Sequence, residues 1–448
     1  MSGPKVYLHP NAVQGFNAEG QALLALIEVA PIIKQASTKA EGGFIPVASL
    51  SLEEIKNFTE MKVDVVGTIL TKHRQIGEGR IGVGEDAYRT VRILSENIQR
   101  TEGFRERVSQ KAVEDTVFDW AVGSHQQTIT APLCEYLLAE FEERVRSIWV
   151  WVPVHGLTTD FDFELGRVEV HPFRPQFFET WEGQLKLKGV WDEQSQALVA
   201  HYRTRLQGHA SCTIKLLAEP MRAKEIALAE TENALAILRT FQPCILHPLI
   251  PSHIRPLGRA HVDGSEVLTI LDDAVVGFAT GDDEPFEYFS LNDETMDMLQ
   301  QAGMGGLHHM FICLNQTEFE KDLWRSIWTF SKSSLQKSPE DRLLYVFRSL
   351  DSFLLQNKTE SIQQSIAERI AFTISDNGED RRAISKTIVK AYGLRSDVVH
   401  HDQKIEELEL LVEFLQVAWR FFVLLIGTRG KYKTRKDFFD TIEKLKFS

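Results

Sequence analysis

Cysteine is scarce in this 448-residue chain, and none of its cysteines belongs to a CxxC pair. The four lie far apart in the sequence, at Cys134, Cys212, Cys244 and Cys313. Such spacing argues against a disulfide framework and against a zinc knuckle. It is typical of a compartment that keeps thiols reduced.

Long apolar runs are also missing. The most apolar stretch, VAWRFFVLLIG at 417–427, is too short to span a bilayer and contains Arg420, so we expect a buried helix there. The first residues, MSGPKVYLHPNAVQGF, have neither the basic flank nor the apolar centre of a signal peptide. The sequence therefore predicts a cytoplasmic protein with no membrane association.

Basic residues are outnumbered by acidic ones, and the formal net charge is −13. A protein that depends on nonspecific binding to DNA is normally basic, so a function on nucleic acid would need a local basic patch. The chain also lacks the P-loop, GxSxG and HExxH motifs. These absences remove the common NTPase, α/β-hydrolase and metalloprotease classes.

The chain is longer than one hydrophobic core usually supports, and its sequence pattern changes twice. Residues 1–145 are rich in helical spacing of apolar residues, as at 20–35 and 85–104. Residues 146–290 carry most of the β signal, and residues 305–448 are almost purely helical in pattern. We predict an α+β protein: an N-terminal mixed α/β part with an antiparallel sheet, then a C-terminal all-α helical bundle.

The antiparallel sheet is predicted from five segments in which apolar and polar residues alternate. They are SIWVWVPVHGL (147–157), FDFELGRVEVHPF (161–173), GQLKLKGVWD (183–192), ALVAHYRTRL (197–206) and SCTIKLLAE (211–219). A long amphipathic helix opened by Pro220 is predicted near 219–241. The four prolines of 243–260 predict a loop or extended connection.

Short polar breaks separate the C-terminal helical segments, which favours an antiparallel bundle. Two of these breaks carry helix-start signals. Ser338 stands before Pro339, and Thr359 stands before Glu360. We therefore expect one helix to begin at each of these breaks.

The segment AYGLRSDVVHHDQK (391–404) places Arg395 five residues before His400. Histidine suits general acid and base catalysis because its pKa lies near neutrality. Arginine suits phosphate because its planar fork donates two hydrogen bonds to two oxygens. RNA carries its own nucleophile, the 2′-hydroxyl, so a base, an acid and a cation are enough to cleave it. An arginine and a histidine close together could therefore supply the groups that this reaction needs.

The stretch YGLRSDVVHH resembles the signature of HEPN domains, in particular the Apea-like branch, whose pattern runs roughly Tyr-x-x-Arg-Ser-x-x-apolar-His. The matching positions here are Tyr392, Arg395, Ser396, Val399 and His400. The family also has an acidic residue on an earlier helix, more often Glu, and Asp351 in VFRSLDSFLLQ falls there. The resemblance covers about 320–427, roughly a quarter of the chain.

The resemblance implies a metal-independent endoribonuclease that leaves 2′,3′-cyclic phosphate ends, uses no cofactor and acts as a homodimer with two Arg-His motifs facing one cleft. Arg395 would hold the scissile phosphate, His400 would be the general acid or base, and Asp351 would orient one of them. Three neighbours would support them: Ser396, Tyr392 and His401. The implied substrate is RNA, with transfer RNA as one candidate.

Nucleases of this family often belong to phage-defence or toxin–antitoxin systems. The resemblance therefore implies a further partner, a trigger or antitoxin protein. From the domain arrangement alone, we expect residues 1–300 to sense the trigger or to hold the nuclease inactive.

A catalytically silent HEPN module is the alternative, serving as a dimerisation domain or adaptor that binds a protein or a nucleotide. In that case Arg395 would pair with Asp351 to lock the bundle, while His400 and His401 would interact with a helix C-terminus. On an ideal helix Arg395 and His400 point about 140° apart, so one protomer would not clamp a phosphate with both. A composite site in a dimer removes this difficulty.

The segment RGKYKTRK (429–436) is basic in an acidic protein. Its cations are Arg429, Lys431, Lys433, Arg435 and Lys436. They could attract RNA phosphates, with Tyr432 available for stacking on a base. The other interpretation is a solvated connector between two helices, and both stay open.

Three further patterns are better explained without a cofactor or metal site. GEGRIG (77–82) has the letters of a dinucleotide fingerprint, but the segment before it is a poor strand, so we expect a flexible glycine loop. Asp160, Asp162 and Glu164 could line one face of a strand for a divalent cation, but such a row is more often a solvated face. The adjacent pair His308 and His309 has no further ligand at useful spacing, so we expect no metal.

Overall fold

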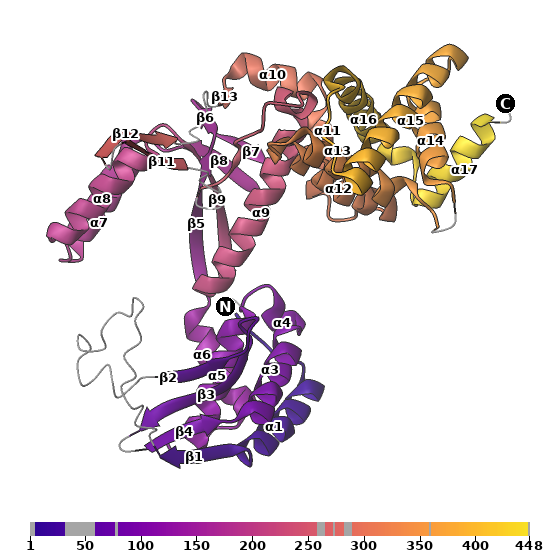
Figure 1. Ribbon diagram of the computed structural model, residues 1–448. Coiled ribbons are helices and arrows are strands. Elements are labelled where there is room, and N and C mark those ends of the chain that lie inside the picture. The colour runs from indigo at the N-terminus through magenta and orange to yellow at the C-terminus, as the bar shows by residue number, and fades with distance from the viewer. Residues whose placement is uncertain are drawn as a thin grey trace. The chain divides into compact units, whose positions relative to one another are not determined.

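The computed structural model describes residues 5–31, 59–76, 79–257, 265–271, 274–281, 289–357 and 360–446 (Figure 1). The chain divides into two compact units. Unit 1 comprises Met1–Val150 and Lys215–Ile226, and unit 2 comprises Trp151–Ile214 and Ala227–Ser448. Sheets lie in the N-terminal half and helices fill the C-terminal region, so the predicted α+β class is confirmed.

Unit 1 contains a four-stranded antiparallel sheet in the order β1-β4-β3-β2. Its strands are β1 (Ile27–Pro31), β2 (Thr59–Val63), β3 (Ile69–Ile76) and β4 (Gly79–Val83). Its helices are α1 (Pro10–Leu24), α3 (Glu85–Gln99), α4 (Glu102–Arg105), α5 (Gln110–His125) and α6 (Leu133–Arg144). Apolar faces of these helices share one buried core with strand β4, in which Val83, Val91, Val117 and Phe141 are fully buried.

Two expectations for unit 1 are wrong. A helix over 20–35 is not formed, because α1 ends at Leu24 and strand β1 follows; residues 32–35 lie outside the described residues. Residues 79–82 of the glycine segment lie in strand β4 and not in a loop, while Gly77 and Glu78 lie outside the described residues. Gly82 is required in β4, since a Cβ there would lie 2.1 Å from the Lys72 carbonyl oxygen. The helix expected from residue 85 is confirmed as α3.

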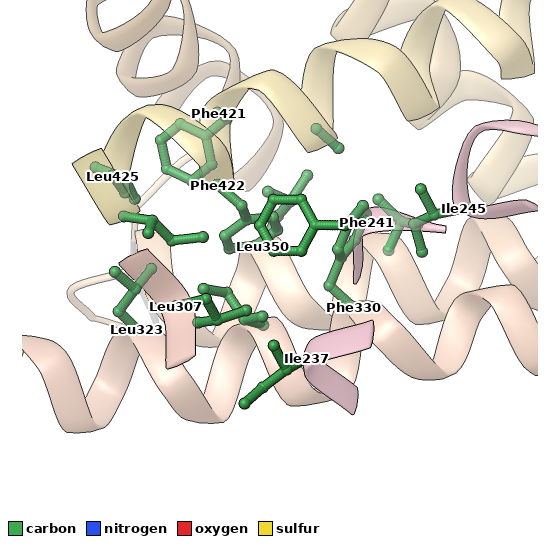
Figure 2. Packing of buried hydrophobic residues seen from close by; sticks show 14 of the residues in the cluster. Ile237, Phe241, Ile245, Leu307, Leu323, Phe330, Leu350, Phe421, Phe422 and Leu425 are labelled. Carbon is green, nitrogen blue, oxygen red and sulfur yellow. The ribbon is translucent and has the colours of Figure 1, made fainter. Parts of the chain in front are cut away.

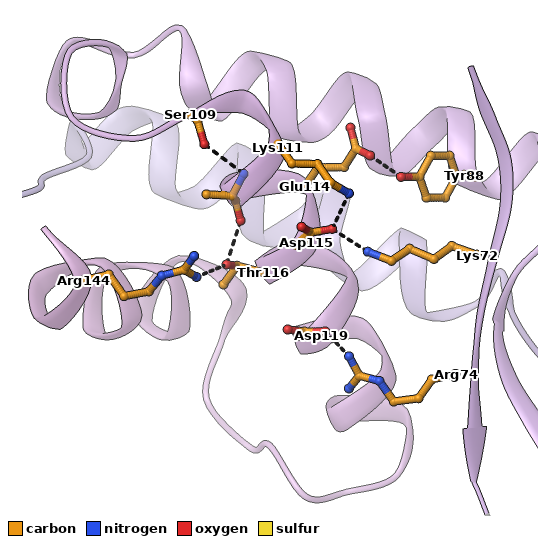
Figure 3. A network of polar contacts seen from close by, with 11 residues as sticks. Lys72, Arg74, Tyr88, Ser109, Lys111, Glu114, Asp115, Thr116, Asp119 and Arg144 are labelled. Atoms are coloured by element: carbon orange, nitrogen blue, oxygen red, sulfur yellow. Dashed lines mark hydrogen bonds and ion pairs between the residues drawn. The ribbon is translucent and has the colours of Figure 1, made fainter. Parts of the chain in front are cut away.

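A polar network joins strand β3 to helix α5 inside unit 1 (Figure 3). The Lys72 ammonium donates to Asp115 at 2.6 Å, and Lys111 donates to the same oxygen at 2.8 Å. The buried hydroxyl of Tyr88 donates to Glu114 on the same helix. These contacts offset the free-energy cost of burying Lys72 and Glu114. The Lys72 ammonium lies against a carboxylate, and the Glu114 carboxylate accepts a hydrogen bond.

The stability of unit 1 is expected to fall in acid through Asp115. Burial raises the pKa of this carboxyl, but hydrogen bonds from Lys111 and Lys72 outweigh it, so its pKa lies below the ordinary value. A lowered pKa stabilises the fold above the unfolded-state pKa and loses that stabilisation as the pH falls through the folded-state pKa. Asp115→Asn should therefore lower the Tm at pH 7 and lower it less at about pH 3. An equal difference at both pH values, measured by thermal denaturation, would contradict this assignment.

A second sheet has five strands in the order β10-β5-β9-β8-β7, and unit 2 contributes residues to each of them. The strands are β5 (Arg146–His155), β7 (Phe163–Leu165), β8 (Val168–Pro172), β9 (Ala210–Ala218) and β10 (Arg255–Pro256). The pairings of β10 with β5, β7 with β8 and β8 with β9 are antiparallel, as predicted. Strands β5 and β9 and helix α9 (Pro220–Phe241) contribute residues to both units.

Two short pairings accompany this sheet. Strand β6 (Leu157–Thr159) pairs in parallel with β13 (Phe289–Leu291). Strands β11 (Ser265–Leu271) and β12 (Ala274–Gly281) form an antiparallel hairpin. The proline-rich segment 243–260 contains the 3₁₀ turn η2 (Pro243–Leu246) and β10, while 258–260 lie outside the described residues.

Two of the five predicted strands are helices. Residues 183–187, the first half of one segment, lie in α7 (Pro175–Leu187), and residues 197–206 lie in α8 (Glu193–Leu206). The alternation of GQLKLK mimics a strand over a short window, where periodicity separates the two states poorly. The overlooked signals are Pro175 at the helix start, Gly189 at φ +70° after α7, and the N-cap Asp192, whose side chain accepts from the Ser195 amide.

The C-terminal region is helical, as predicted. Its helices are α10 (Asp293–Gln301), α11 (Met304–Ile312), α12 (Glu318–Ser331), α13 (Pro339–Leu354), α14 (Ile362–Ile374), α15 (Gly378–His401), α16 (Leu408–Thr428) and α17 (Arg435–Lys446). Ser338 caps α13 by accepting from the Asp341 amide, which confirms that start signal. Helix α14 begins beyond the second signal, after Ser361, and Thr359 lies outside the described residues.

One hydrophobic core joins this bundle to the sheet of unit 2. Figure 2 shows Ile237, Phe241 and Ile245 packed among side chains of α11, α12, α13 and α16. The Trp419 indole also donates to the Thr240 carbonyl at 2.9 Å. A bundle cut at residue 305 would expose these contacts, so the whole chain is the appropriate form for functional assays.

The helix Leu408–Lys431 is long and apolar enough to cross a membrane by length and composition, but half of its most apolar stretch is buried inside the structure. Phe414, Phe421 and Phe422 are fully buried in the bundle core. This is the packing of a core helix, and the expected buried helix at 417–427 is confirmed.

Candidate functional site

Arg395 and His400 lie on one uninterrupted helix, α15. The helix begins where the Asn377 side chain accepts from the amides of Glu379 and Asp380. It ends at Asp402, which adopts a left-handed conformation with φ 50°. Because the helix continues regularly through both residues, their side chains leave it in directions about 140° apart.

Arg395 faces the neighbouring helix α13. Its guanidinium lies 3.5 Å from the carboxylate of Asp351. The same guanidinium lies 5.1 Å from the Tyr392 ring and 5.7 Å from the Phe347 ring, within the range of cation–π attraction. Tyr392 packs edge-on against Phe347 at 5.6 Å. The structure thus brings together three of the residues that sequence analysis singled out: Asp351, Tyr392 and Arg395.

The Asp351 carboxyl is only partly satisfied. Its Oδ1 is buried and has no hydrogen-bond partner among the described residues. Burial raises the pKa of Asp351, and the nearby Arg395 charge counteracts only part of that effect. A buried carboxyl with a perturbed pKa beside a cation is a feature that clusters at functional sites, although structural ion pairs can show it too.

Replacement of Asp351 is expected to stabilise the protein. A raised folded-state pKa means that this carboxyl favours folding below its unfolded-state pKa, and that the contribution is lost as the pH rises through the folded-state pKa. Asp351→Asn carries no charge, so its Tm should exceed that of the wild type at pH 8 and match it at about pH 3. Asp376→Asn is the control, because the Asp376 side chain is fully exposed. A lower Tm at pH 8 would show that the pair with Arg395 outweighs burial.

His400 is exposed in the last turn of α15, next to the exposed His401. Among the described residues, none forms a hydrogen bond or ion pair with the His400 side chain. The ring of His401 lies 6.5 Å away, and Ser396 is half-buried one turn earlier on the same helix. The structure therefore does not bring His400 together with Arg395 or Asp351 within one chain.

The basic segment 429–436 is divided between the bundle and the solvent. Arg429 lies 3.8 Å from Glu320, and Arg435 donates to the Leu355 carbonyl. Tyr432 packs on Phe319 at 5.1 Å, so its ring is already occupied by a protein contact. Three cations of the segment remain exposed: Lys431, Lys433 and Lys436.

A hollow of about 520 Å³ beside α15 and the start of α16 was missed by sequence analysis. It is lined by Lys390, Glu406, Glu407, Leu408, Glu409, Leu410 and Glu413. Four glutamates against one lysine would repel an RNA backbone from this side of α15. The cluster of glutamates in 406–413 was the available sequence signal.

The acidic row at 160–164 is dispersed. Asp162 lies 2.8 Å from Arg174 and 3.2 Å from His171, while Glu164 lies in strand β7 and Asp160 in the turn before it. His308 accepts a hydrogen bond from the Gly166 amide through Nδ1 at 3.0 Å. Within the described ranges, no group of three or more His, Cys, Asp or Glu side chains could hold a metal ion.

Comparison with known proteins finds no protein-family model, no curated protein and no solved structure that matches this chain.

Proposed function

We propose that the protein is a metal-independent endoribonuclease of HEPN type. The observation that carries the proposal is the difference between the environments of Arg395 and His400 along α15. Arg395 lies against Asp351 of α13 at 28% side-chain exposure, and His400 is exposed to solvent five residues later. A positioned cation and an unengaged imidazole are the two groups that RNA transesterification requires.

In the proposed reaction a base takes the proton of the 2′-hydroxyl, and the 2′-oxygen forms a bond to phosphorus. The bond from phosphorus to O5′ breaks, its electron pair goes to O5′, and an acid protonates that oxygen. The products are a 2′,3′-cyclic phosphate and a 5′-hydroxyl, with no water or redox partner consumed. His400 would serve as the base or the acid, and Arg395 would neutralise the charge that develops on the phosphate oxygens.

A homodimer completes this site in the proposal. Arg395 and His400 of one chain leave α15 in different directions, so they do not converge on one phosphate. Two copies that face each other through α15 would supply two histidines, one as base and one as acid. The exposed Val399 and His400 lie on the part of α15 that such a partner would cover.

Cleavage of RNA in the presence of EDTA is the direct test. The whole chain is incubated with total transfer RNA and with a structured messenger RNA, and the product ends are identified. The proposal expects fragments with 2′,3′-cyclic phosphate ends. Fragments with 3′-hydroxyl ends, or cleavage that EDTA prevents, would show a different reaction.

A catalytically silent dimerisation or adaptor module is the second candidate. The pair of Arg395 with Asp351, reinforced by the rings of Tyr392 and Phe347, could serve only to lock α15 onto α13. In that case Arg395→Ala should lower the Tm or the dimer content, because it leaves a buried carboxylate without its cation. His400→Ala should then change neither RNA binding nor any other measured property.

A defence or toxin-like role in the cytoplasm completes the proposal, with unit 1 holding the nuclease inactive until a trigger or antitoxin protein acts. Gly82→Val tests this in the whole chain, because any side chain at position 82 collides with the Lys72 carbonyl and should loosen unit 1. Basal RNA cleavage should rise while unit 2 stays folded. Unchanged basal cleavage would contradict a restraining role for unit 1.

A further inference from the structure

Two oppositely charged surfaces lie at the two ends of helix α16, and neither of them contains Arg395 or His400. The first is the hollow of about 520 Å³ at the start of the helix. Its carboxylates, here called the acidic end, are those of Glu406, Glu407, Glu409 and Glu413. The second surface follows the last turn of the helix. Its exposed cations, here called the basic end, are Lys431, Lys433 and Lys436.

The acidic end carries negative charge that its own chain does not neutralise. All four glutamates are exposed, and none forms an ion pair with another described residue. Of the described residues that line the hollow, Lys390 alone is a cation. Glu409 lies in the first turn of α16, where a carboxylate interacts favourably with the helix dipole. Glu413 lies beyond that turn and accepts only a 3.4 Å hydrogen bond from the Thr387 hydroxyl, so its charge has no such explanation.

The hollow also offers apolar surface for the stems of long cations. Leu408 and Leu410 line it, and both are half-buried. A lysine can lay its methylene stem along such a surface while its ammonium lies among the carboxylates. The chain before α16 is held in place, because Ile405 is buried and its amide donates to Glu340 at 2.8 Å. The acidic end is therefore formed before a partner binds, which lowers the entropic cost of binding.

The basic end is presented by an ordered connector between α16 and α17. The Asp437 carboxylate accepts from the amides of Lys433 and Thr434, at 3.0 and 2.9 Å. The Phe319 amide donates to the Lys433 carbonyl at 3.0 Å. The three lysine side chains of the basic end form no ion pair within the described part of the chain. Their charges are therefore free to meet carboxylates of another molecule.

The two ends cannot meet within one chain. Helix α16 (Leu408–Thr428) runs without interruption between them. At a rise of about 1.5 Å per residue, the helix separates them by about 30 Å. A second copy of the chain carries both complementary surfaces, and a contact between two different surfaces is head to tail.

We propose that the basic end of one copy docks into the acidic end of a second copy. Each bound copy keeps one unused end, so the contact can repeat and build an open chain or a closed ring. Exposed ion pairs are individually weak, so the assembly should grow with protein concentration and shrink with salt. This contact goes beyond the proposed nuclease, since neither Arg395 nor His400 takes part in it.

Sedimentation velocity of the whole chain at increasing protein concentration tests the contact. In about 0.1 M NaCl charges are screened over about 10 Å, and the average mass should rise with concentration above that of the smallest species. In about 1 M NaCl the screening length is about 3 Å, and the rise should disappear. A mass that stays constant in the lower salt, or a rise that survives the higher salt, would overturn the proposal.

Charge reversal at each end localises the contact. Glu406→Lys with Glu413→Lys alters the acidic end, and Lys431→Glu with Lys433→Glu alters the basic end. Each double variant should keep a constant mass in about 0.1 M NaCl, where the wild type assembles. Wild-type assembly by both double variants would show that the ends of α16 do not make the contact.

A mixture of the two double variants separates this contact from a symmetric one. The unaltered basic end of one variant still fits the unaltered acidic end of the other, so the mixture should form complexes that neither forms alone. No association in the mixture would contradict a head-to-tail contact. Glu179→Lys with Glu193→Lys is the control for the acidic end, because these exposed glutamates of α7 and α8 give the same change of net charge. This control should assemble like the wild type.

A poly-lysine peptide tests the other occupant of the hollow. If the wild type keeps a constant mass but binds this peptide, and Glu406→Lys with Glu413→Lys abolishes the binding, the hollow takes a basic segment of a different protein. That result would overturn the contact between copies. Because mass and binding are measured and not cleavage, failure of this contact and failure of the proposed nuclease are distinguishable.

Discussion

His400→Ala is expected to reduce metal-independent RNA cleavage by at least about 100-fold, the lower end of what a general acid or base contributes. The same substitution should leave the Tm unchanged. The His400 side chain is exposed, and within the described part of the chain it has no hydrogen-bond or ion-pair partner to lose. A large loss of activity without a loss of stability is the signature of a residue that acts on the substrate.

His125→Ala provides the matched control for that experiment. His125 is also an exposed histidine in the last turn of a helix, α5, so it shares the favourable interaction with a helix C-terminus. Cleavage by this variant should equal that of the wild type. Comparable losses in both variants would indicate that helix-end histidines matter for folding, and wild-type activity in His400→Ala would remove it from the chemistry.

The long amphipathic helices and their ends could be predicted from local sequence. Pro220 opens α9 and Ser338 caps α13, and both signals depend only on residues within one turn of the helix. The strands of unit 1 could not be predicted in this way. Strand β3 carries Lys72, His73 and Arg74 in a row, which resembles a loop until α5 and β1 supply the acidic partners.

Only some contacts of the candidate site could be predicted from the sequence. From the family resemblance, Asp351 was expected to orient either Arg395 or His400, and the structure places it 3.5 Å from Arg395. The engagement of Arg435 and Tyr432 inside the bundle did not follow, because it depends on Leu355 and Phe319, far away in the sequence.

The sequence around Arg342 gives no signal of its structural role in unit 2. Its guanidinium nevertheless donates several hydrogen bonds to backbone carbonyls. It is 1% exposed, and burial lowers its pKa to about 10. No carboxylate among the described residues pairs with it. Its guanidinium instead donates to five backbone carbonyls, those of Ser334, Gln336, Cys244, His247 and Ile250. It thereby fastens the proline-rich connection, which has few backbone donors of its own, to the start of α13.

Arg342→Met is expected to destabilise unit 2 by at least about 4 kcal/mol, since hydrogen bonds to a charged group are worth about 1.5–3 kcal/mol each and several buried carbonyls would lose their donor. Urea denaturation followed by tryptophan fluorescence measures the total. Hydrogen exchange of the Ser252 amide, which donates to the Ser334 carbonyl at 2.6 Å, reports the connection itself. That amide should lose protection in the variant.

Two further variants separate the geometry of Arg342 from its charge. Arg342→Lys keeps the charge but not the planar fork, so it cannot reach five carbonyls at once and should fall between the wild type and Arg342→Met. Arg325→Met removes an arginine whose side chain is 76% exposed, and it should change stability by less than about 0.5 kcal/mol. If Arg342→Lys were as stable as the wild type, a buried positive charge alone would hold the connection. If Arg342→Met were as stable as Arg325→Met, the connection would be held by its apolar contacts, with Ile245 and Ile254 as the buried anchors.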